Sequence, residues 1–475
     1  MRKILGKLGA YFKSIGEAIA KGDLFVKLSM IIMGAGYFRR KQIVKGILIT
    51  ILQIVMVIFT GEVAIPYLSK FGTLGTVQRE MEFNLATMKN EVNDYDHSFT
   101  ILLFGLVSIL VLVGFAVIWL NNLREARKLQ LMAKNGQHIN TFREDIKLFF
   151  NQKFHITLLA LPVTGIVIFT VIPLLVLVTV AFTNYDQQHM PPTSLFTWVG
   201  LANFKSLFSQ SVSVSFGYSF GKVLTWTLIW AFFATFTTYF GGILLASFIN
   251  NKKTKFPKFW RTLFIIAIAV PQFVTLLLVR NFFSDVGIVN NILSNLGVTD
   301  FLKSIGLVKE SLTYIPFLTD PNWAKVTIIV INIWIGVPYL MLIATGVLMN
   351  IPIDMLESAR IDGANPFQIF RKITMPYMLF VTGPYLVTSF VNNINNFNVI
   401  YLLTQDVFFT QDQYLANSHA KEIDLLVTWL YRLTQEYYNY KMASVIGIMV
   451  FLVCAVFTLV AFNLMIRGDK EEEFR

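Results

Sequence analysis

The sequence predicts an all-α membrane protein with about eight transmembrane helices. Hydrophobic residues make up 55% of the 475 residues and charged residues only 14%, well below the charged share of soluble domains. Eight apolar runs are each long enough, at roughly 20 residues, to cross the hydrocarbon layer of a bilayer. They lie near residues 43–66, 100–120, 156–182, 224–249, 261–283, 324–348, 377–403 and 442–466.

The charges between these runs predict how the chain crosses the membrane. Basic residues gather in 39–45, 121–155 and 250–261, whereas 67–99 is acidic. Basic loops remain in the cytoplasm, and an even number of spans then places both termini there. Because topology explains the net charge of +12, the expected surroundings are membrane lipid, and no nucleic-acid partner is expected.

The order of the segments predicts an N-terminal addition followed by a core. Residues 1–42 are expected to form a cytoplasmic amphipathic segment on the membrane surface, since no signal-peptide pattern follows their charges. Residues 43–155 hold two spans, an acidic outer loop and a basic cytoplasmic linker. Six spans in 156–466 form the core, in which function should reside, and 467–475 form a cytoplasmic tail.

Residues 350–376, between the sixth and seventh spans, are expected to form a helix, a turn and a second helix on the cytoplasmic side. Asn350 or Ile351 can cap the first helix, and Pro352 fits its first turn. Gly363 suits a left-handed cap at the end of this helix.

The second helix is expected to follow Asn365 as its cap, with Pro366 in its first position and Pro376 as its stop. On local physics alone, the pair is either a well-capped connection between spans or an element that docks into a groove on a cytoplasmic partner. Docking would transmit rigid-body motion.

This segment resembles the coupling loop of ATP-binding cassette importer permeases. That loop has the pattern E-A-A, three residues, G, nine residues, I-x-L-P, which is matched here by Glu357, Ser358, Ala359, Gly363, Ile373, Met375 and Pro376. Ser358 in place of Ala and Met375 in place of Leu are mild departures. The resemblance implies that the loop seats in a cleft of an ATPase subunit. The residues implied in coupling are Glu357, Ser358, Ala359, Asp362, Gly363, Ile373 and Pro376.

Further stretches look like the larger permease of the maltose-type carbohydrate importers, over roughly residues 155–466. They are AFTNYD (181–186), VGLANF (199–204), RTLFIIAIAVPQ (261–272), GIVNNIL (287–293), IWIGVPYLM (333–341) and NNFNVIYLLT (395–404). The resemblance implies a type I importer permease that carries maltodextrins, or else raffinose-type or galactoside-type oligosaccharides. The loop after the third span has only about 40 residues, whereas some members carry a large folded domain there, so the Gram-positive type is expected.

The family's architecture implies several partners. They are a second, smaller permease subunit, two copies of an ATPase and an extracellular sugar-binding protein. The partner ATPase would use ATP and Mg²⁺, and this chain is expected to bind no cofactor. It contains no phosphate-binding loop and its five histidines lack metal-ligand spacing, so the chain is not expected to be an enzyme.

Polar residues within the sixth and seventh spans predict a substrate pathway. Asn332, Gly336 and Tyr339 share one face of a helix, and Ser389, Asn393 and Asn396 share one face of the next, with Asn392 beside them. Amides are costly against lipid and offer both donors and acceptors to hydroxyl groups.

The pathway residues have structural alternatives. The amides can instead hydrogen-bond between packed helices, and Gly336 with Pro338 can mark a kink. Because the inner parts of these two spans contain no Lys, Arg, Asp or Glu, a neutral substrate is favoured over an ion. An ion-coupled secondary transporter and a membrane-embedded enzyme are the weaker alternatives.

Overall fold

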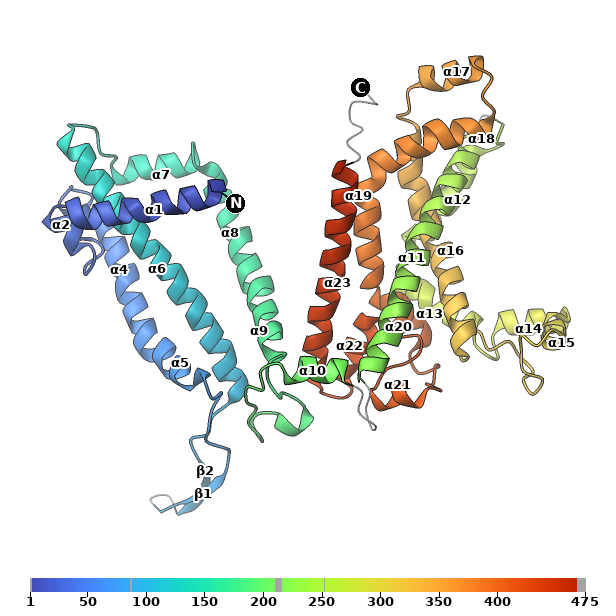
Figure 1. Ribbon diagram of the computed structural model, residues 1–475, viewed down its shortest axis with the longest axis horizontal. Helices are drawn as coiled ribbons and strands as arrows, with labels where there is room; N and C mark the ends of the chain where they lie inside the picture. The colour runs from blue at the N-terminus through green and yellow to red at the C-terminus, as the bar shows by residue number, and fades with distance from the viewer. Residues whose placement is uncertain (1, 86–87, 210–215, 252, 468–475) are drawn as a thin grey trace. The chain divides into compact units, whose positions relative to one another are not determined.

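The computed structural model describes residues 2–85, 88–209, 216–251 and 253–467 (Figure 1). Over these residues the chain is helical except for one two-stranded hairpin and the connecting loops, which confirms the predicted all-α class. The chain divides into two compact units, residues 1–200 and residues 201–475. Of the predicted tail 467–475, residues 468–475 lie outside the described residues.

Six described helical segments are long and apolar enough to cross a membrane, and they coincide with predicted spans one to four, six and eight. They are Ile43–Phe71, Ser98–Lys134, Phe154–Val180, Phe216–Ile249, Pro321–Leu348 and Tyr440–Leu464. The α-helices in them are α4 (Ile43–Phe59), α5 (Ile65–Phe71), α6 (Ser98–Lys134), α8 (Phe154–Ile166), α9 (Ile172–Val180), α11 (Phe216–Ile249), α16 (Pro321–Leu348) and α23 (Tyr440–Arg467).

Predicted spans five and seven are each interrupted, which corrects the expectation of two continuous helices. Span five consists of α12 (Pro257–Ala269) and α13 (Gln272–Phe282). Between them Val270 precedes a proline and has φ −78° and ψ 127°, because proline pushes the residue before it into extended conformation. Span seven is divided into α19 (Met375–Ile394) and α20 (Phe397–Thr404).

In the first unit, α1 (Arg2–Lys21) runs across the end of α6 (Figure 1). Ala18 of α1 is fully buried and packs in one cluster with Ala126 of α6. A helix is therefore present in the segment 1–42, and part of its apolar side contacts α6. Its expected place on the membrane surface stays a prediction.

The first unit also contains a hairpin that the sequence did not predict. Its strands β1 and β2 are antiparallel, with Met81 opposite Val92. The third span belongs to this unit by its packing, since α9 contacts α6. The expected start of the six-span core at residue 156 stays a prediction. The short elements of the unit are α2 (Leu24–Leu28), α3 (Ala35–Phe38), β1 (Met81–Asn84), β2 (Lys89–Val92), α7 (Phe142–Phe150) and η3 (Gln187–His189).

Three π-helical turns each precede a proline at the second position of the next helix. They are η1 (Thr60–Ala64) before Pro66, η2 (Val167–Val171) before Pro173, and η4 (Phe370–Thr374) before Pro376. Proline lacks an N–H and its ring clashes with the preceding turn, and the wider π turn accommodates both. The sequence predicted that Pro376 stops the second helix, and this prediction is wrong. The chain stays helical from α18 (Pro366–Ile369) through η4 into α19.

In the second unit, α11 packs along α16 and also against α19. A Cβ atom on Gly242 of α11 would clash with the Cβ of Leu340 and would lie 2.9 Å from its carbonyl carbon. The two helices therefore approach closely because this residue is glycine. The remaining elements of the unit are α10 (Ala202–Phe208), α14 (Ile288–Asn295), α15 (Val298–Ser304), α17 (Ile353–Ile361), α21 (Gln413–Asn417) and α22 (Leu426–Gln435).

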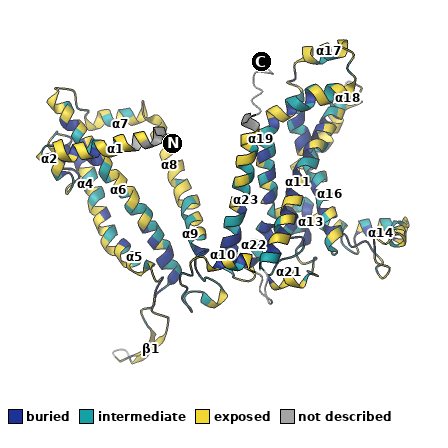
Figure 2. Cartoon of the chain, in the orientation of Figure 1, coloured by how far each residue is buried: buried dark blue, intermediate teal, exposed yellow. Residues whose placement is uncertain are grey.

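Many residues of the spans are exposed in the single chain (Figure 2), and a large share of them are apolar. In the most apolar 18-residue window of Phe154–Val180, only 6% of the residues are buried, against 44% for Phe216–Ile249. In water such faces would be unstable. They are instead suited to lipid or to another membrane subunit.

We expect Gly242→Ala to destabilise the protein by about 1–3 kcal/mol, because the added methyl group overpacks the contact between α11 and α16. The matched control is Gly221→Ala on the same helix, where a Cβ meets nothing within 4 Å and alanine should be neutral or stabilising. The measurement is the thermal unfolding midpoint of both variants in detergent. Equal midpoints would contradict the close packing described above.

Candidate functional site

A cavity of about 430 Å³ opens where span five is interrupted, between α12, α13 and α16. We call it the pathway cavity. Its lining residues are Ile268, Ala269, Val270, Pro271, Gln272, Thr275, Trp334, Ile335, Gly336 and Tyr339. Two of the residues predicted from the sixth span, Gly336 and Tyr339, are therefore brought to a cavity, and the Tyr339 side chain is half exposed.

The pathway cavity also contains two polar residues that sequence reasoning missed, Gln272 and Thr275. Both lie on α13, directly after the break in span five. The available signal was Pro271 in the middle of an apolar run, since interrupted helices in membranes occur where backbone lines a cavity. No residue that lines this cavity carries a charge.

The rest of the predicted face on α16 has a packing role. A Cβ on Gly336 would lie 2.8 Å from the Cγ2 of Thr238 on α11, so glycine at this position permits close helix packing and also lines the cavity. Helix α16 continues without interruption through Pro338. Asn332 is buried, with 8% of its surface exposed, and is not among the residues that line the cavity.

The amides of span seven hold the break between α19 and α20. Asn393 donates a hydrogen bond from Nδ2 to Thr235 Oγ1 on α11 (3.0 Å), and its backbone carbonyl accepts one from Trp230 Nε1 (3.0 Å). Asn396 donates to Asn393 Oδ1 (3.3 Å), and its own Oδ1 accepts from the backbone N–H of Val399 (3.3 Å). The alternative of hydrogen bonding between helices therefore applies to Asn393.

The other predicted pathway residues of span seven lie nearby on α19. Ser389 is half-buried and Asn392 is exposed. The pathway cavity contains none of the span-seven residues, so the facing sets expected from the sequence do not meet there. The pathway role of the seven residues stays a prediction.

The predicted helix–turn–helix is present, with one correction at its start. Helix α17 begins after Pro352, which takes the cap position expected for Asn350 or Ile351. At its end Gly363 has φ +79°, and the N–H groups of Gly363 and Ala364 bond to the carbonyls of Arg360 (3.0 Å) and Ala359 (2.9 Å). This is the glycine cap that the sequence indicated.

Asn365 caps the second helix as expected. Its Oδ1 accepts from the N–H of Gln368 (2.8 Å), and the Gln368 side chain accepts from the N–H of Asn365 (2.8 Å). This reciprocal pair is a capping box. Three residues inside one loop therefore fix the bend between α17 and α18: Gly363, Asn365 and Gln368.

The loop 350–376, which we call the coupling loop, lies at one end of the second unit (Figure 1). Ile353, Ile361 and Phe367 are 69%, 86% and 69% exposed. Of the predicted coupling residues, the structure exposes Glu357, Ser358, Asp362 and Gly363 and half-buries Ala359, Ile373 and Pro376. Apolar side chains held this far from the helix bundle are suited to a partner's groove.

The comparison with known proteins decides the family. The family described as "Binding-protein-dependent transport system inner membrane component" matches residues 238–467. The chain is 31% identical to the maltodextrin transport system permease protein MalC of Streptococcus pneumoniae, over 94% of this chain and 96% of that protein. The chain belongs to this family. The permease is also 32% identical to the galactooligosaccharides transport system permease protein GanP of Bacillus subtilis, over 89% of its length and 93% of that protein.

A solved structure of similar fold agrees with this membership. The permease matches a chain of a bacterial alginate ABC transporter, in complex with an alginate pentasaccharide-bound periplasmic protein, with TM-score 0.52 and 25% identity, over 69% of the permease and 98% of that chain. The permease is therefore the membrane subunit of an ABC importer with partner components and is not itself an enzyme. The ion-coupled transporter considered from the sequence is excluded.

We expect Asn393→Ala to destabilise the permease by about 1–3 kcal/mol, because Thr235 and Asn396 lose a half-buried hydrogen-bond partner. The control is Asn398→Ala on the exposed side of α20, which should change stability by no more than about 0.5 kcal/mol. Unfolding midpoints of the purified permease in detergent would measure the difference. Equal effects would show that the amide bonds do not hold the break.

Proposed function

We propose that the permease imports maltodextrins and passes them through the pathway cavity by alternating access. The main support for this proposal is that the lining of the cavity is uncharged. Tyr339 offers a ring face and a hydroxyl group, and Gln272 offers an amide donor and acceptor. Such a lining suits a neutral ligand with many hydroxyl groups. The name of MalC, a maltodextrin permease, supports this substrate.

The uncharged lining also favours some other saccharides over charged ones. Galactooligosaccharides, the substrate in the name of GanP, are a second candidate because they are also neutral, and raffinose-type oligosaccharides belong to the same class. An acidic polysaccharide such as alginate is disfavoured. Its carboxylates would need basic partners, which the lining of the pathway cavity does not supply.

We infer that four further chains complete the importer: one smaller permease subunit, two copies of an ATPase and one extracellular sugar-binding protein. The exposed apolar faces of the spans support a second membrane subunit. The alternation of basic and acidic loops supports termini that lie in the cytoplasm. The match to a Streptococcus permease over 94% of this chain supports an origin in a Gram-positive bacterium. ATP and Mg²⁺ belong to the ATPase in this assembly, and this chain binds no cofactor.

The coupling loop is the proposed link to the ATPase. Its exposed Ile353, Ile361 and Phe367 would enter the ATPase cleft, with Glu357 beside them. Its fixed bend, capped at Gly363 and Asn365, would carry ATPase movement into α19 through the helical path of α18 and η4.

We expect Tyr339→Ala to lower uptake of labelled maltotriose at least tenfold, a loss of about 1.4 kcal/mol or more of binding in the pathway. Tyr339→Phe keeps the ring and should retain more uptake than the alanine variant. The assay uses cells that lack the gene and carry each variant at matched membrane levels. Normal maltotriose uptake in the cells that lack the gene would instead reject maltodextrin as the principal substrate.

We expect Gly363→Asp to uncouple ATP hydrolysis from transport, because a side chain at φ +79° costs about 1–2 kcal/mol and displaces the bend of the coupling loop. Gly297→Asp is the matched control, since Gly297 has φ +74° and equally open space in a loop at the opposite end of the second unit. ATPase activity and uptake are measured together in proteoliposomes of the full importer. Coupled transport by Gly363→Asp, or equal losses in both variants, would refute the role of this loop.

A further inference from the structure

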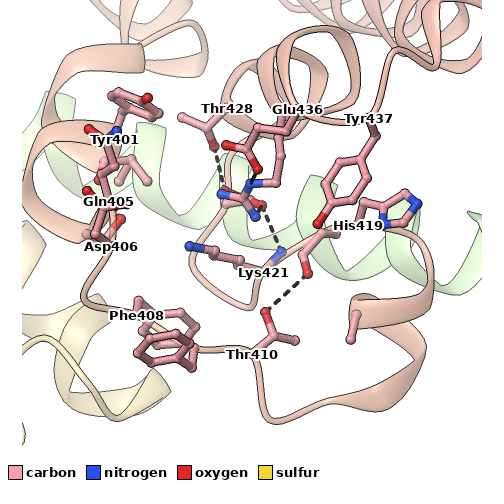
Figure 3. Close-up of a pocket in the computed structure, with 17 residues that line it drawn as sticks. Tyr401, Gln405, Asp406, Phe408, Thr410, His419, Lys421, Thr428, Glu436 and Tyr437 are labelled. Carbon is pink, nitrogen blue, oxygen red and sulfur yellow. Dashed lines mark hydrogen bonds and ion pairs between the residues drawn. The ribbon is translucent and has the colours of Figure 1, made fainter. Parts of the chain in front are cut away.

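A second cavity, of about 450 Å³, lies at the end of the second unit opposite the coupling loop, beside α20, α21 and α22 (Figures 1 and 3). We call it the outer pocket. It shares no lining residue with the pathway cavity, and none of the predicted pathway residues lies in it. Its walls are more polar than those of the pathway cavity, and they come from a segment that is irregular between its helices.

A buried ion pair fixes the wall of the outer pocket. Asp424, 2% exposed, accepts two hydrogen bonds from the Arg432 guanidinium, at 3.0 and 3.1 Å. The same carboxylate accepts the N–H of Lys421 (2.7 Å) and the hydroxyl of Thr428 (3.0 Å). A buried carboxylate with this many partners holds the loop and α22 in one arrangement.

The backbone around the outer pocket is held in costly conformations. Asp406 and His419, which line it, have φ of +62° and +59°, and Tyr438, next to a lining residue, has φ +50°. Left-handed conformation is uncommon for residues other than glycine, and it persists where surrounding structure enforces it, often at ligand sites. Both Asp406 and His419 line the pocket in these conformations.

Among the residues that the structure describes, the ammonium group of Lys421 makes no hydrogen bond and no ion pair within 4.0 Å, although it lines the outer pocket. The half-buried Lys421 side chain points into the pocket, toward the side where Gln405 and Asp406 lie (Figure 3). Burial and the nearby Arg432 lower the pKa of Lys421, and the carboxylates of Asp424, Glu436 and Asp406 offset this only in part. An oxygen ligand within hydrogen-bond distance would therefore stabilise the charged ammonium group.

The balance of groups selects the kind of ligand. Three carboxylates, those of Asp406, Asp424 and Glu436, and two cations, Lys421 and Arg432, line the outer pocket. The three carboxylates disfavour an anionic ligand, and the two cationic side chains disfavour a cationic ligand. A neutral molecule with several hydroxyl groups can accept from Lys421 and donate to the acidic and amide oxygens at once.

Aromatic faces complete the outer pocket. The rings of His419 and Tyr437 stack with their centroids 3.6 Å apart and an interplanar angle of 13°, and Figure 3 shows them together on one side of the pocket with Tyr401 across from them. Flat, partly exposed rings offer apolar surface to the C–H faces of a sugar while their polar atoms remain available.

We propose that the outer pocket is a saccharide-binding subsite separate from the pathway cavity, in which Lys421 and Asp406 hold the hydroxyl groups of one sugar unit against the aromatic wall. The subsite rests on the proposed function, because its ligand is the transported saccharide. It would hold one sugar unit at the outer end of the permease, apart from the break in span five.

The test measures protection of one introduced thiol by maltotriose. The only native cysteine is removed by Cys454→Ala, and Thr410→Cys is introduced at the wall of the outer pocket. Maleimide labelling is measured in solubilised membranes that contain the full importer. At about ten times the dissociation constant, maltotriose leaves about a tenth of the sites free and should slow labelling about tenfold. Thr313→Cys, exposed in the loop before α16, is the control and should label at the same rate with and without sugar.

Two further variants identify the residues responsible. Lys421→Ala should abolish the protection without unfolding the site, because its ammonium group leaves no partner unsatisfied. Asp406→Asn should weaken it, and asparagine tolerates the left-handed backbone there. Tyr339→Ala in the pathway cavity should reduce uptake but leave the protection of Thr410→Cys intact.

The outcomes separate the subsite from the transport function. Normal maltotriose uptake without protection at Thr410→Cys would overturn the subsite and leave the proposed function standing. Protection that requires the binding protein but no sugar would assign the outer pocket to protein docking and also overturn it. Absence of both uptake and protection would reject maltodextrin as substrate and the subsite with it.

Discussion

The structure of this permease depends on satisfying backbone polar groups within the chain, since lipid offers them no partners. Spans five and seven leave regular helix at Val270–Pro271 and at Asn395–Asn396. At the second break, Asn393 and Asn396 bond across it and to α11. At the first, the chain lines a cavity in place of lipid. Polar residues of the kind predicted to line the pathway therefore also stabilise the interruption of span seven.

This constraint joins two interpretations that the sequence presents as alternatives. Asn393 is tied to Thr235 and Trp230, which is a packing role, while Asn392 on the same helix is exposed. Gly336 likewise both borders the pathway cavity and permits contact with Thr238. One helix face can therefore serve packing and the proposed pathway together, and the two interpretations do not exclude each other.

The parts of the permease that were predictable are those determined by neighbours in sequence. The caps at Gly363 and Asn365 follow from local backbone chemistry, and span lengths follow from hydrophobic runs. The place of Gln272 in the pathway cavity and that of Lys421 in the outer pocket depend on residues distant in sequence, which local patterns do not encode. Pro376 shows the limit even for local rules, because the π turn before it absorbs the proline and the helix continues.

That continuity at Pro376 makes α19 a lever arm. The coupling loop leads through α18 and η4 into α19 without a flexible link, and α19 has 20 residues, hence a length of about 30 Å. Tilting this rod by about 10° at its η4 end would swing its far end by about 5 Å, roughly the width of a sugar ring. The far end carries Asn393, so a small rotation beside the coupling loop would become a displacement of several ångströms at the break in span seven.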